Sequence, residues 1–557
     1  MKNKILYTAA LSLLCLGFSS CGDSWLDTES KTTHNSGNFN KDEQQINASV
    51  IGCYDGYQRT VSNGNFPPLF LVTEMGGDDA LGGGSADDRT CRVIDRLDQN
   101  LNSSDVSFLG NLWSDYYKGI ERCNDLLAKI DNVTFANEDD KKAAIGETRA
   151  IRGLEYFDLV RTFEKVPLLT TVTSDIVPQS DPDAVYAQIV ADLKYAADNI
   201  PANYYTSKSS SLGRITRYAA GAMLARVYLF YDGVYNNNQR GTMPGDLTAA
   251  QALKYCEDVI ASGQYKLEPN FRDLWPAAAT TASSKADGWI NTYKEASDEL
   301  VWVVKFNNDQ DWTSTNINGN RFVVNLGIGV WDGSSAPYGP GWQQAPISAK
   351  AYNLYEDGDT RLDASIINFR KEGFFDKEMA STAYDMTGYS NKKYCPLVYT
   401  DGTSIPAYAA MNETSGANFM TSQDQDWVLM RYSDVLLMAA ELGSSNAMRY
   451  YNLVVERAFG NTSHDLTTTP TTQQIWDERR LEFMGEGLRY WDLRRQGLDA
   501  FVKGIMAQGQ TVYNSGKKTD TTDSYQEANI RAKRGFWQIP NNQITLSGNV
   551  YKQNAGW

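Results

Sequence analysis

Residues 426–441 read DWVLMRYSDVLLMAAE, and residues 478–495 read ERRLEFMGEGLRYWDLRR. Apolar residues recur three and four positions apart in the first stretch, which predicts one face of a helix; the same spacing returns near 446–458 and over 473–495. In the second stretch, carboxylates stand three or four residues from arginines, and on a helix such residues face each other. The spacing therefore predicts structural ion pairs, with a catalytic pair of carboxylates as the alternative interpretation.

Further amphipathic runs precede these stretches and come in pairs. They cover residues 41–60, 107–131, 138–162, 183–199, 215–232 and 248–262. One helix pair cannot bury its own apolar face, so neighbouring pairs must stack, as in solenoid repeats. The sequence predicts a mainly α fold.

The character of the sequence changes between residues 265 and 425. The run Leu300-Val-Trp-Val-Val-Lys-Phe306 predicts a strand, and around it lie loops rich in Gly, Asn, Ser and Trp. Because functional contacts usually lie on loops, we expect an irregular ligand-binding lobe here. The expected organisation is N-terminal helical repeats over 38–264, the lobe over 265–425, and a C-terminal segment, 426–557, that completes the scaffold.

The N-terminus predicts export. Lys2 and Lys4 precede an apolar run that is too short to span a bilayer and that ends in Phe18-Ser-Ser-Cys21. This ending resembles a bacterial lipobox, with Phe18 at the position of the usual Leu. We expect residues 1–20 to be removed as a signal peptide, Cys21 to be acylated, and residues 21–37 to form a lipidated tether. The alternative is an ordinary signal peptide, with Cys21 incidental.

Composition excludes several classes of protein. The 557 residues carry a net charge of −16 without a basic stripe, which argues against binding to nucleic acid. Only two histidines are present, so His-based catalytic triads and multi-His metal sites are nearly excluded. Beyond Cys21 the five cysteines show no CxxC spacing, which makes a zinc site improbable and leaves any disulfide undetermined.

Two loops carry the candidate ligand-binding residues. The first, 74–92, combines glycines with the charged residues Asp78, Asp79, Arg89 and Arg92, whose groups accept and donate paired hydrogen bonds to sugar hydroxyls. Its alternatives are a solvated acidic loop or a Ca²⁺ site, since aspartates suit a hard cation. No other cofactor is expected.

The second loop, 307–345, supplies aromatic side chains. A flat ring can cover the apolar C–H face of a sugar, and the candidates are Trp312, Trp331 and Tyr338, with Trp289 further upstream. Trp342 is a weaker candidate. Packing in the core is the alternative interpretation of all of these aromatic residues.

A series of motifs is spread over nearly the full length of the chain. They include Cys21…Leu26-Asp27, Arg152-Gly-Leu-Glu-Tyr-Phe157, Arg431-Tyr-Ser-Asp-Val-Leu-Leu-Met438, Glu478-Arg-Arg-Leu-Glu-Phe483, Glu486-Gly-Leu-Arg-Tyr-Trp-Asp-Leu493 and Phe536-Trp-Gln-Ile-Pro540. Together and in this order, these motifs resemble those of the SusD/RagB family of outer-membrane lipoproteins. The resemblance implies four tetratricopeptide-like helix pairs that carry an irregular lobe with short strands. It also implies a location at the cell surface and a SusC-like TonB-dependent barrel as partner. Trp342 resembles a packing position of the family.

The expected function is therefore a non-catalytic lipoprotein that captures oligosaccharides and delivers them to the transporter. The alternative is the oligopeptide-binding lid of a RagA/RagB-like importer, which would use backbone hydrogen bonds and the acidic loop 74–92. A glycosidase with two carboxylates is the third hypothesis.

Overall fold

The computed structural model describes residues 39–61, 66–205, 213–282, 289–307, 319–329, 335, 337–400, 404–406, 420 and 423–557. The predicted signal peptide, Cys21 and the tether lie outside these residues. Among the helices of the described ranges, none is long and apolar enough to cross a membrane.

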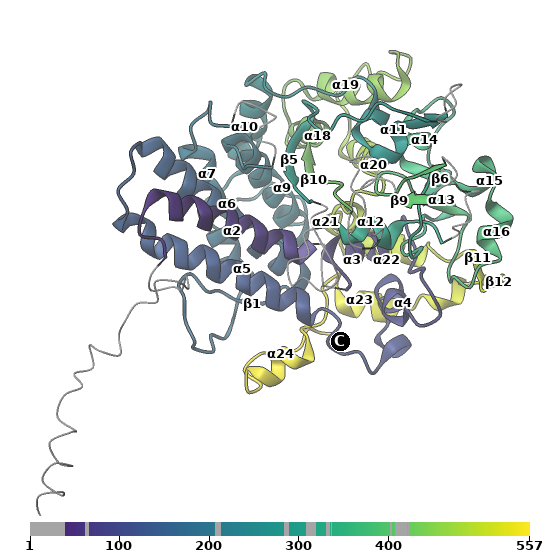
Figure 1. The fold of residues 1–557 in the computed structure, drawn as a ribbon, viewed down its shortest axis with the longest axis horizontal. Helices are drawn as coiled ribbons and strands as arrows, with labels where there is room; N and C mark the ends of the chain where they lie inside the picture. The colour runs from purple at the N-terminus through teal and green to yellow at the C-terminus, as the bar shows by residue number, and fades with distance from the viewer. Residues whose placement is uncertain are drawn as a thin grey trace, which may run out of the picture.

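The described part of the chain contains four stacked helix pairs (Figure 1). The pairs are α2 (Glu43–Val61) with α5 (Gly110–Lys129), α6 (Glu138–Phe163) with α7 (Pro182–Asn199), α9 (Arg217–Tyr235) with α10 (Ala249–Ala261), and α18 (Tyr432–Glu441) with α19 (Ala447–Phe459). Each pair packs on the next, through α5 on α6, α7 on α9 and α10 on α18. The prediction of a mainly α scaffold is confirmed.

Local sequence explains where the scaffold helices begin. Asn137 caps α6 by accepting a hydrogen bond from Asp139 N, and Thr248 and Gln251 form a capping box at the start of α10. One apolar core cluster then runs through all four pairs, so burial of the shared faces holds the stack together.

The remaining elements are short. Most of them form the irregular lobe and its supports at the right of Figure 1, while α24 lies below the helix pairs and contacts α5. The helices are α3 (Leu69–Gly76), α4 (Arg89–Arg96), α11 (Pro276–Ala279), α12 (Arg321–Leu326), α13 (Ala349–Tyr352), α14 (Arg361–Ser365), α15 (Phe369–Glu372), α16 (Phe375–Met379), α20 (Thr472–Glu482), α21 (Arg489–Arg495), α22 (Leu498–Met506), α23 (Glu527–Lys533) and α24 (Asn541–Leu546).

The strands form antiparallel pairs. They are β1 (Val166–Pro167) with β2 (Gln179–Ser180), β3 (Thr280–Ala282) with β4 (Trp289–Asn291), β5 (Leu300–Val304) with β10 (Trp427–Arg431), β6 (Ile366–Asn368) with β7 (Tyr389–Asn391), β8 (Val398–Thr400) with β9 (Ser404–Pro406), and β11 (Thr511–Asn514) with β12 (Lys517–Asp520). The predicted strand at 300–306 is thus present as β5.

Two helix predictions were wrong in part. The stretch 426–441 begins as strand β10, because its first residues are all buried and pair with β5. The stretch 473–495 is two helices, α20 and α21, separated by a turn in which Gly485 and Gly487 have φ of +78° and +74°. That left-handed conformation ends a helix and is open to glycine at little cost.

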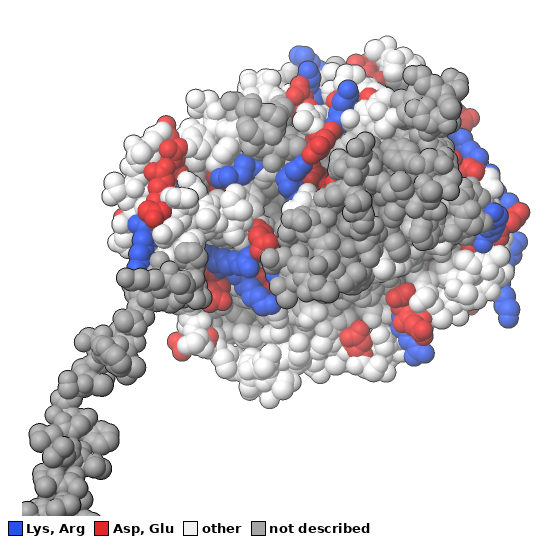
Figure 2. Space-filling model, in the orientation of Figure 1, with Lys and Arg blue, Asp and Glu red and all other residues white. Residues whose placement is uncertain are grey.

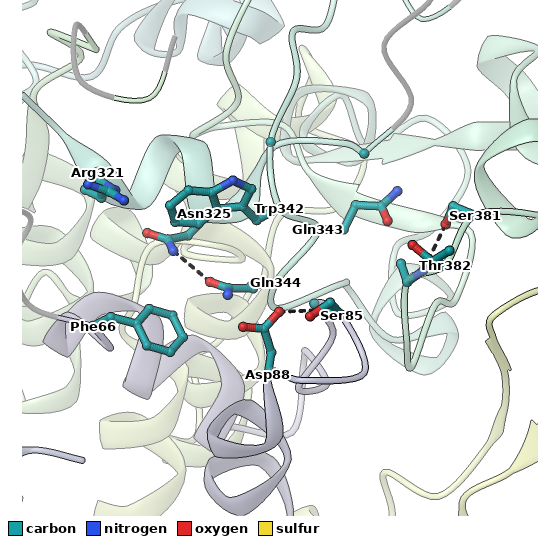
Figure 3. Close-up of a pocket in the computed structure, with 14 residues that line it drawn as sticks. Phe66, Ser85, Asp88, Arg321, Asn325, Trp342, Gln343, Gln344, Ser381 and Thr382 are labelled. Atoms are coloured by element: carbon teal, nitrogen blue, oxygen red, sulfur yellow. Dashed lines mark hydrogen bonds between the residues drawn. The ribbon is translucent and has the colours of Figure 1, made fainter. Parts of the chain in front are cut away.

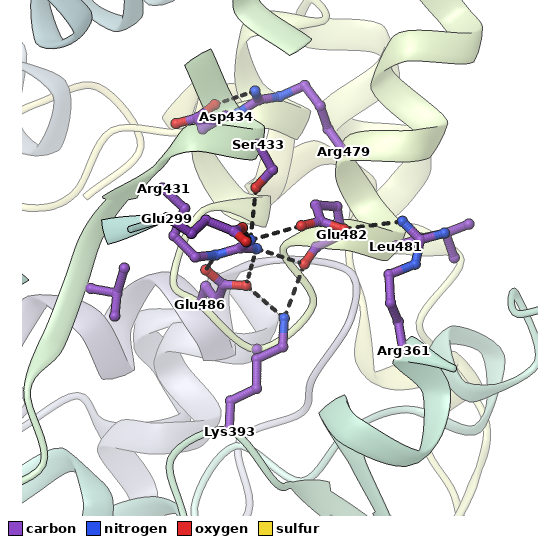
Figure 4. A network of polar contacts seen from close by, with 12 residues as sticks. Glu299, Arg361, Lys393, Arg431, Ser433, Asp434, Arg479, Leu481, Glu482 and Glu486 are labelled. Carbon is purple, nitrogen blue, oxygen red and sulfur yellow. Dashed lines mark hydrogen bonds and ion pairs between the residues drawn. The ribbon is translucent and has the colours of Figure 1, made fainter. Parts of the chain in front are cut away.

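The charged run 478–495 lies in a buried network of ion pairs (Figure 4). Arg431 is at its centre and donates to carboxylates on three sides, those of Glu299, Glu482 and Glu486. Lys393 also pairs with Glu486, at 2.6 Å. The network agrees with the structural interpretation, but most partners come from distant segments of the chain and not from neighbouring turns of one helix.

Charges at the surface are mixed. On the face shown in Figure 2, blue and red side chains lie close together, without a broad area of one sign among the described residues. This arrangement fits the absence of a basic stripe in the sequence.

Glu74 makes the stability of the fold depend on pH. It is buried on α3 and accepts a hydrogen bond from Gly487 N. Burial raises the pKa of Glu74 to about 8. Between its ordinary pKa near 4.5 and this value, the folded state holds a proton that the unfolded state releases, so stability falls as pH rises, by on the order of 1 kcal/mol per pH unit.

We expect the Glu74→Gln variant to lose this part of the pH dependence and to gain stability relative to the parent at pH 8. Thermal unfolding followed by circular dichroism at pH 5, 6.5 and 8 measures the effect. Glu527→Gln, which changes an exposed carboxylate on α23, is the matched control. Parallel Tm curves for the parent and Glu74→Gln would contradict the assignment.

Candidate functional site

The lobe contains a pocket of about 640 Å³, here called the lobe pocket. Its lining comes from four segments: the turn that precedes α3, the loop between α3 and α4, α12 with the loop that follows it, and the loop after α16. The lining residues are Phe66, Gly84, Ser85, Asp88, Arg321, Asn325, Gly329, Gly341, Trp342, Gln343, Gln344, Ser381, Thr382 and Ala383 (Figure 3).

The two loops that the sequence singled out meet at this pocket. Isolated bridges join Ala80 to Ile347 and Gly83 to Gln344 in antiparallel fashion. Backbone hydrogen bonds link them: Gly84 N donates to Gln343 O at 3.0 Å, and Ala345 N donates to Gly82 O at 3.1 Å. One wall of the pocket therefore consists of segments that are about 260 residues apart in the chain.

Gly83 permits this close approach. Its φ is +67°, and a Cβ atom there would overlap Gln343 O and the ring of Pro346. We expect Gly83→Ala to separate the two loops and to weaken ligand binding at least tenfold, as measured by isothermal titration calorimetry. Left-handed backbone alone costs an alanine about 1–2 kcal/mol of stability.

Gly373→Ala is the control for this variant. Gly373 has a φ of +89° but no heavy atom within 4 Å of the added Cβ, so that variant carries the backbone strain without the collision. Equal effects of the two substitutions on binding would show that contact between the loops does not shape the pocket.

Asp78 and Asp79 anchor the base of the first loop. Asp78 accepts from Arg489 Nε at 2.6 Å, and Asp79 accepts from Arg480 Nε at 2.7 Å. Both carboxylates are buried, and neither lines the lobe pocket. Burial raises the pKa of Asp78, but the charge and hydrogen bond of Arg489 and the charge of Arg480 together leave that pKa below its usual value. These two predicted site residues thus hold the loop in place.

Arg92 shapes the turn that borders the pocket, and Arg89 is exposed outside the lining. The guanidinium of Arg92 donates to Ser85 O at 3.2 Å and to Ala86 O at 2.7 Å, and it lies 5.1 Å from the ring centroid of Tyr384. Within the same turn, Asp88 accepts a hydrogen bond from Ser85 N at 2.7 Å. Arg92 is therefore a positioning residue for Ser85 and Asp88.

Trp342 provides the half-buried aromatic surface of the pocket. The guanidinium carbon of Arg321 lies 4.8 Å from the centroid of its ring. Below the indole in Figure 3, Asn325 Nδ2 donates to Gln344 Oε1 at 2.7 Å. Phe66 adds a second ring, which is 41% exposed. Aromatic faces combined with amides and hydroxyls form a surface that can stack on a ring and bond to its polar edge.

The other aromatic candidates lie elsewhere. Tyr338 is buried in a small core cluster, where its hydroxyl donates to Glu372 Oε1 at 2.9 Å. The backbone of Trp289 belongs to β4. The side chain of Trp289 and the whole of Trp312 and Trp331 lie outside the described residues, so these three remain predictions.

Several pocket residues had no signal in the sequence. Phe66, the amides of Gln343 and Gln344, and the segment 381–383 sit in no recognisable motif. Phe66 is followed by two prolines, which mark a turn, but a turn does not reveal which cavity it borders.

Metal and thiol chemistry gain no support from the described ranges. They contain no group of three or more His, Cys, Asp or Glu side chains arranged to hold a metal ion. The aspartates proposed for Ca²⁺ include Asp78 and Asp79, which pair with arginines. The five described cysteines are free thiols and buried.

Models of two related protein families match the C-terminal and N-terminal halves of the chain. The model of the SusD family matches residues 298–557, and a SusD-like model described as "Starch-binding associating with outer membrane" matches residues 24–229. The chain belongs to the SusD family. Each of the two loops at the lobe pocket lies within one of these matches: the first loop is in the N-terminal match, and the second is in the C-terminal match.

Relatives of this SusD-family protein are similar over most of their length. SusD-like protein P2 of Formosa agariphila is 25% identical over 72% of this chain and 74% of its own. A SusD-like protein of Bacteroides ovatus is 24% identical over 88% of this chain and 82% of its own.

Solved structures share the fold. A laminarin binding SusD-like protein aligns with a TM-score of 0.69 and 26% identity over 93% of this chain and 100% of its own. Surface glycan-binding protein A from Bacteroides thetaiotaomicron, in complex with laminarihexaose, aligns with a TM-score of 0.70 and 23% identity over the same shares.

Proposed function

We propose that this SusD-family protein binds oligosaccharides in the lobe pocket and performs no chemistry on them. The observation that carries the proposal is the lining itself, in which Trp342 and Phe66 stand beside a set of amides and hydroxyls. The apolar face of a sugar ring stacks on the indole, while its hydroxyls exchange hydrogen bonds with Gln344, Ser85 and their neighbours. The laminarin-related names of two structural neighbours support a glucan as the first ligand to test.

The expected affinity is modest. Covering about half of an aromatic side chain at ~25 cal/mol per Å² contributes roughly 2 kcal/mol per ring before ordering costs. Two rings with a few hydrogen bonds then give dissociation constants in the micromolar to millimolar range. Such affinity suits a protein that must release its cargo.

Delivery is the second part of the proposal. The acylated Cys21 predicted from the sequence would hold the protein on the outer membrane at the cell surface, and a SusC-like TonB-dependent transporter would receive the cargo. The lipobox-like N-terminus and the outer-membrane association in the family description support this part.

A hydrolytic function has little support in the lobe pocket. Glycosidases place two carboxyl groups on either side of the scissile bond. Asp88 is the single carboxylate among the described residues that line the pocket, while Glu482 and Glu486 are buried in ion pairs with Arg431.

Retention on polysaccharides tests the proposal. The soluble form, residues 22–557, is run through native gels that contain laminarin, starch or other glycans, with bovine albumin as a non-binding control. We expect slower migration with one glycan class and no release of reducing ends over days. Unchanged migration with every glycan would refute glycan binding for that panel, and release of reducing ends would support an enzyme.

A further inference from the structure

A second pocket of about 370 Å³ lies between helix α2 and strand β5, and it is called the α2–β5 groove below. One wall is the face of α2 that carries Ile51, Tyr54, Asp55 and Gln58. The opposite wall is formed by the consecutive residues 302–305. Ile151 and Leu154 of α6 complete the apolar part of the lining.

The edge of β5 borders this groove. Side chains alternate between the two faces of a strand, so four consecutive residues line one cavity when the backbone edge faces it. β5 pairs with β10 along one edge, and within the described residues no strand pairs with its other edge. That second edge is therefore the wall of the α2–β5 groove.

The hydrogen bond of Gln58 shows which backbone groups point into the groove. Gln58 Nε2, on α2, donates to Lys305 O at 2.5 Å, so this carbonyl points away from β10. Backbone groups of residues two positions apart point to the same side of a strand, which directs the N–H and C=O of Val303 into the groove as well. The described part of the chain provides no backbone partner for Val303 on that side.

The rim of the groove is polar and nearly balanced in charge. Arg214 pairs with Glu147 at 2.6 Å, Lys305 pairs with Asp426 at 2.6 Å, and Asp55 accepts from Arg122 at 2.8 Å. Because each charge has a partner, the rim offers no net attraction to a charged ligand. Ile51, which is 51% exposed, leaves an apolar entrance between these pairs.

We propose that the α2–β5 groove binds an extended oligopeptide, which adds as a third strand to the edge of β5 that faces away from β10 and that no described strand pairs with. The backbone of Val303 exchanges two hydrogen bonds with one residue of the peptide, and an apolar side chain of the peptide packs on Ile151 and Leu154. Backbone bonding gives affinity independent of sequence, and the apolar floor selects the side chain. A sugar has no alternating donor and acceptor groups at the spacing of a strand, so the edge favours a peptide. This site goes beyond the glycan-binding function and is separate from the lobe pocket.

Hydrogen exchange measured by mass spectrometry tests the proposal on the soluble form, residues 22–557. The probe is a tryptic digest of β-casein, with laminarihexaose in a parallel arm. We expect the digest to slow exchange of the amides in 300–306 at least tenfold and laminarihexaose to leave them unchanged. Laminarihexaose should instead slow exchange in 321–344, which reports the lobe pocket, so failure of either site is seen separately.

Two variants and a control complete the test. Ile51→Trp fills the entrance and should abolish the protection by the digest. Gln58→Ala removes the side chain that donates to Lys305 O and should change the protection of 300–306. Met448→Trp, at an exposed position on α19, should behave like the parent.

Three results would overturn the proposal. They are exchange of 300–306 that the digest does not change, equal protection in the parent and in Ile51→Trp, and protection by laminarihexaose. Protection that rises with protein concentration in the absence of peptide would identify a second copy of this chain as the occupant, and would also overturn it.

Discussion

Replacing Arg431 by methionine is expected to lower the free energy of unfolding by about 3–5 kcal/mol, enough to prevent stable folding. Arg431 has no exposed surface in its side chain, and its guanidinium bonds to Glu299, Glu482 and Glu486. Methionine fills similar space but leaves three buried carboxylates with less positive charge among them. Removing one partner of a buried ion pair is far more damaging than replacing all partners with apolar groups.

Soluble yield and thermal unfolding by circular dichroism measure this effect. Arg531→Met is the matched control, because Arg531 is 44% exposed in its side chain and pairs with Asp499 and Glu527 at the surface. Exposed pairs contribute about 0–1 kcal/mol, so the control should melt close to the parent. If the two variants melt at the same temperature, the network does not stabilise the fold in the way that its burial indicates.

Replacing Trp342 by alanine is expected to weaken oligosaccharide binding by about thirtyfold, which corresponds to roughly 2 kcal/mol for the loss of one stacking ring. The indole borders the lobe pocket together with Asn325 and Gln344, and its loss also removes the surface on which Arg321 packs. Isothermal titration with laminarihexaose, together with the polysaccharide retained in the native gels, measures the change. The helical circular dichroism signal should stay as in the parent.

Trp342→Phe and Trp557→Ala are the controls for this result. Phenylalanine keeps a flat ring and should retain most of the affinity. Trp557 packs on Phe108 and Trp537 outside the lobe pocket, so its loss tests a general effect of removing an indole. Full affinity of Trp342→Ala, with loss of binding in the Trp312→Ala/Trp331→Ala double variant, would move the site to the residues first predicted from sequence.

The sequence predicts the scaffold well because the apolar spacing that indicates each helix lies within the residues of that helix. The amphipathic spacing in 107–131 marks α5, Gly110–Lys129, to within three residues at each end, since one face of that helix is buried and the other is in contact with solvent. The same rule fails at Trp427–Arg431, where every residue is buried and periodicity no longer distinguishes a strand from a buried helix.

The site is predicted only in part, and the reason is long-range pairing. Loop composition drew attention to 74–92 and 307–345, but nothing local indicates that Gly83 meets Gln344. Asp78 and Asp79 look like ligand contacts in sequence because their partners, Arg489 and Arg480, come some 400 residues later. Trp342 looked like a packing residue, and one face of it does pack, against Arg321.

The anchoring of Asp78 and Asp79 by Arg489 and Arg480 also sets an order of events in biogenesis. The early helix pairs involve contacts between neighbouring segments and can form while the chain is still being synthesised or translocated. The loop 77–88 receives its anchors only after residue 489 has emerged, when almost the whole polypeptide is available. The lobe pocket is therefore completed at the very end of maturation. A chain that ends before α21 would keep most of its helices but would bind no ligand in that pocket.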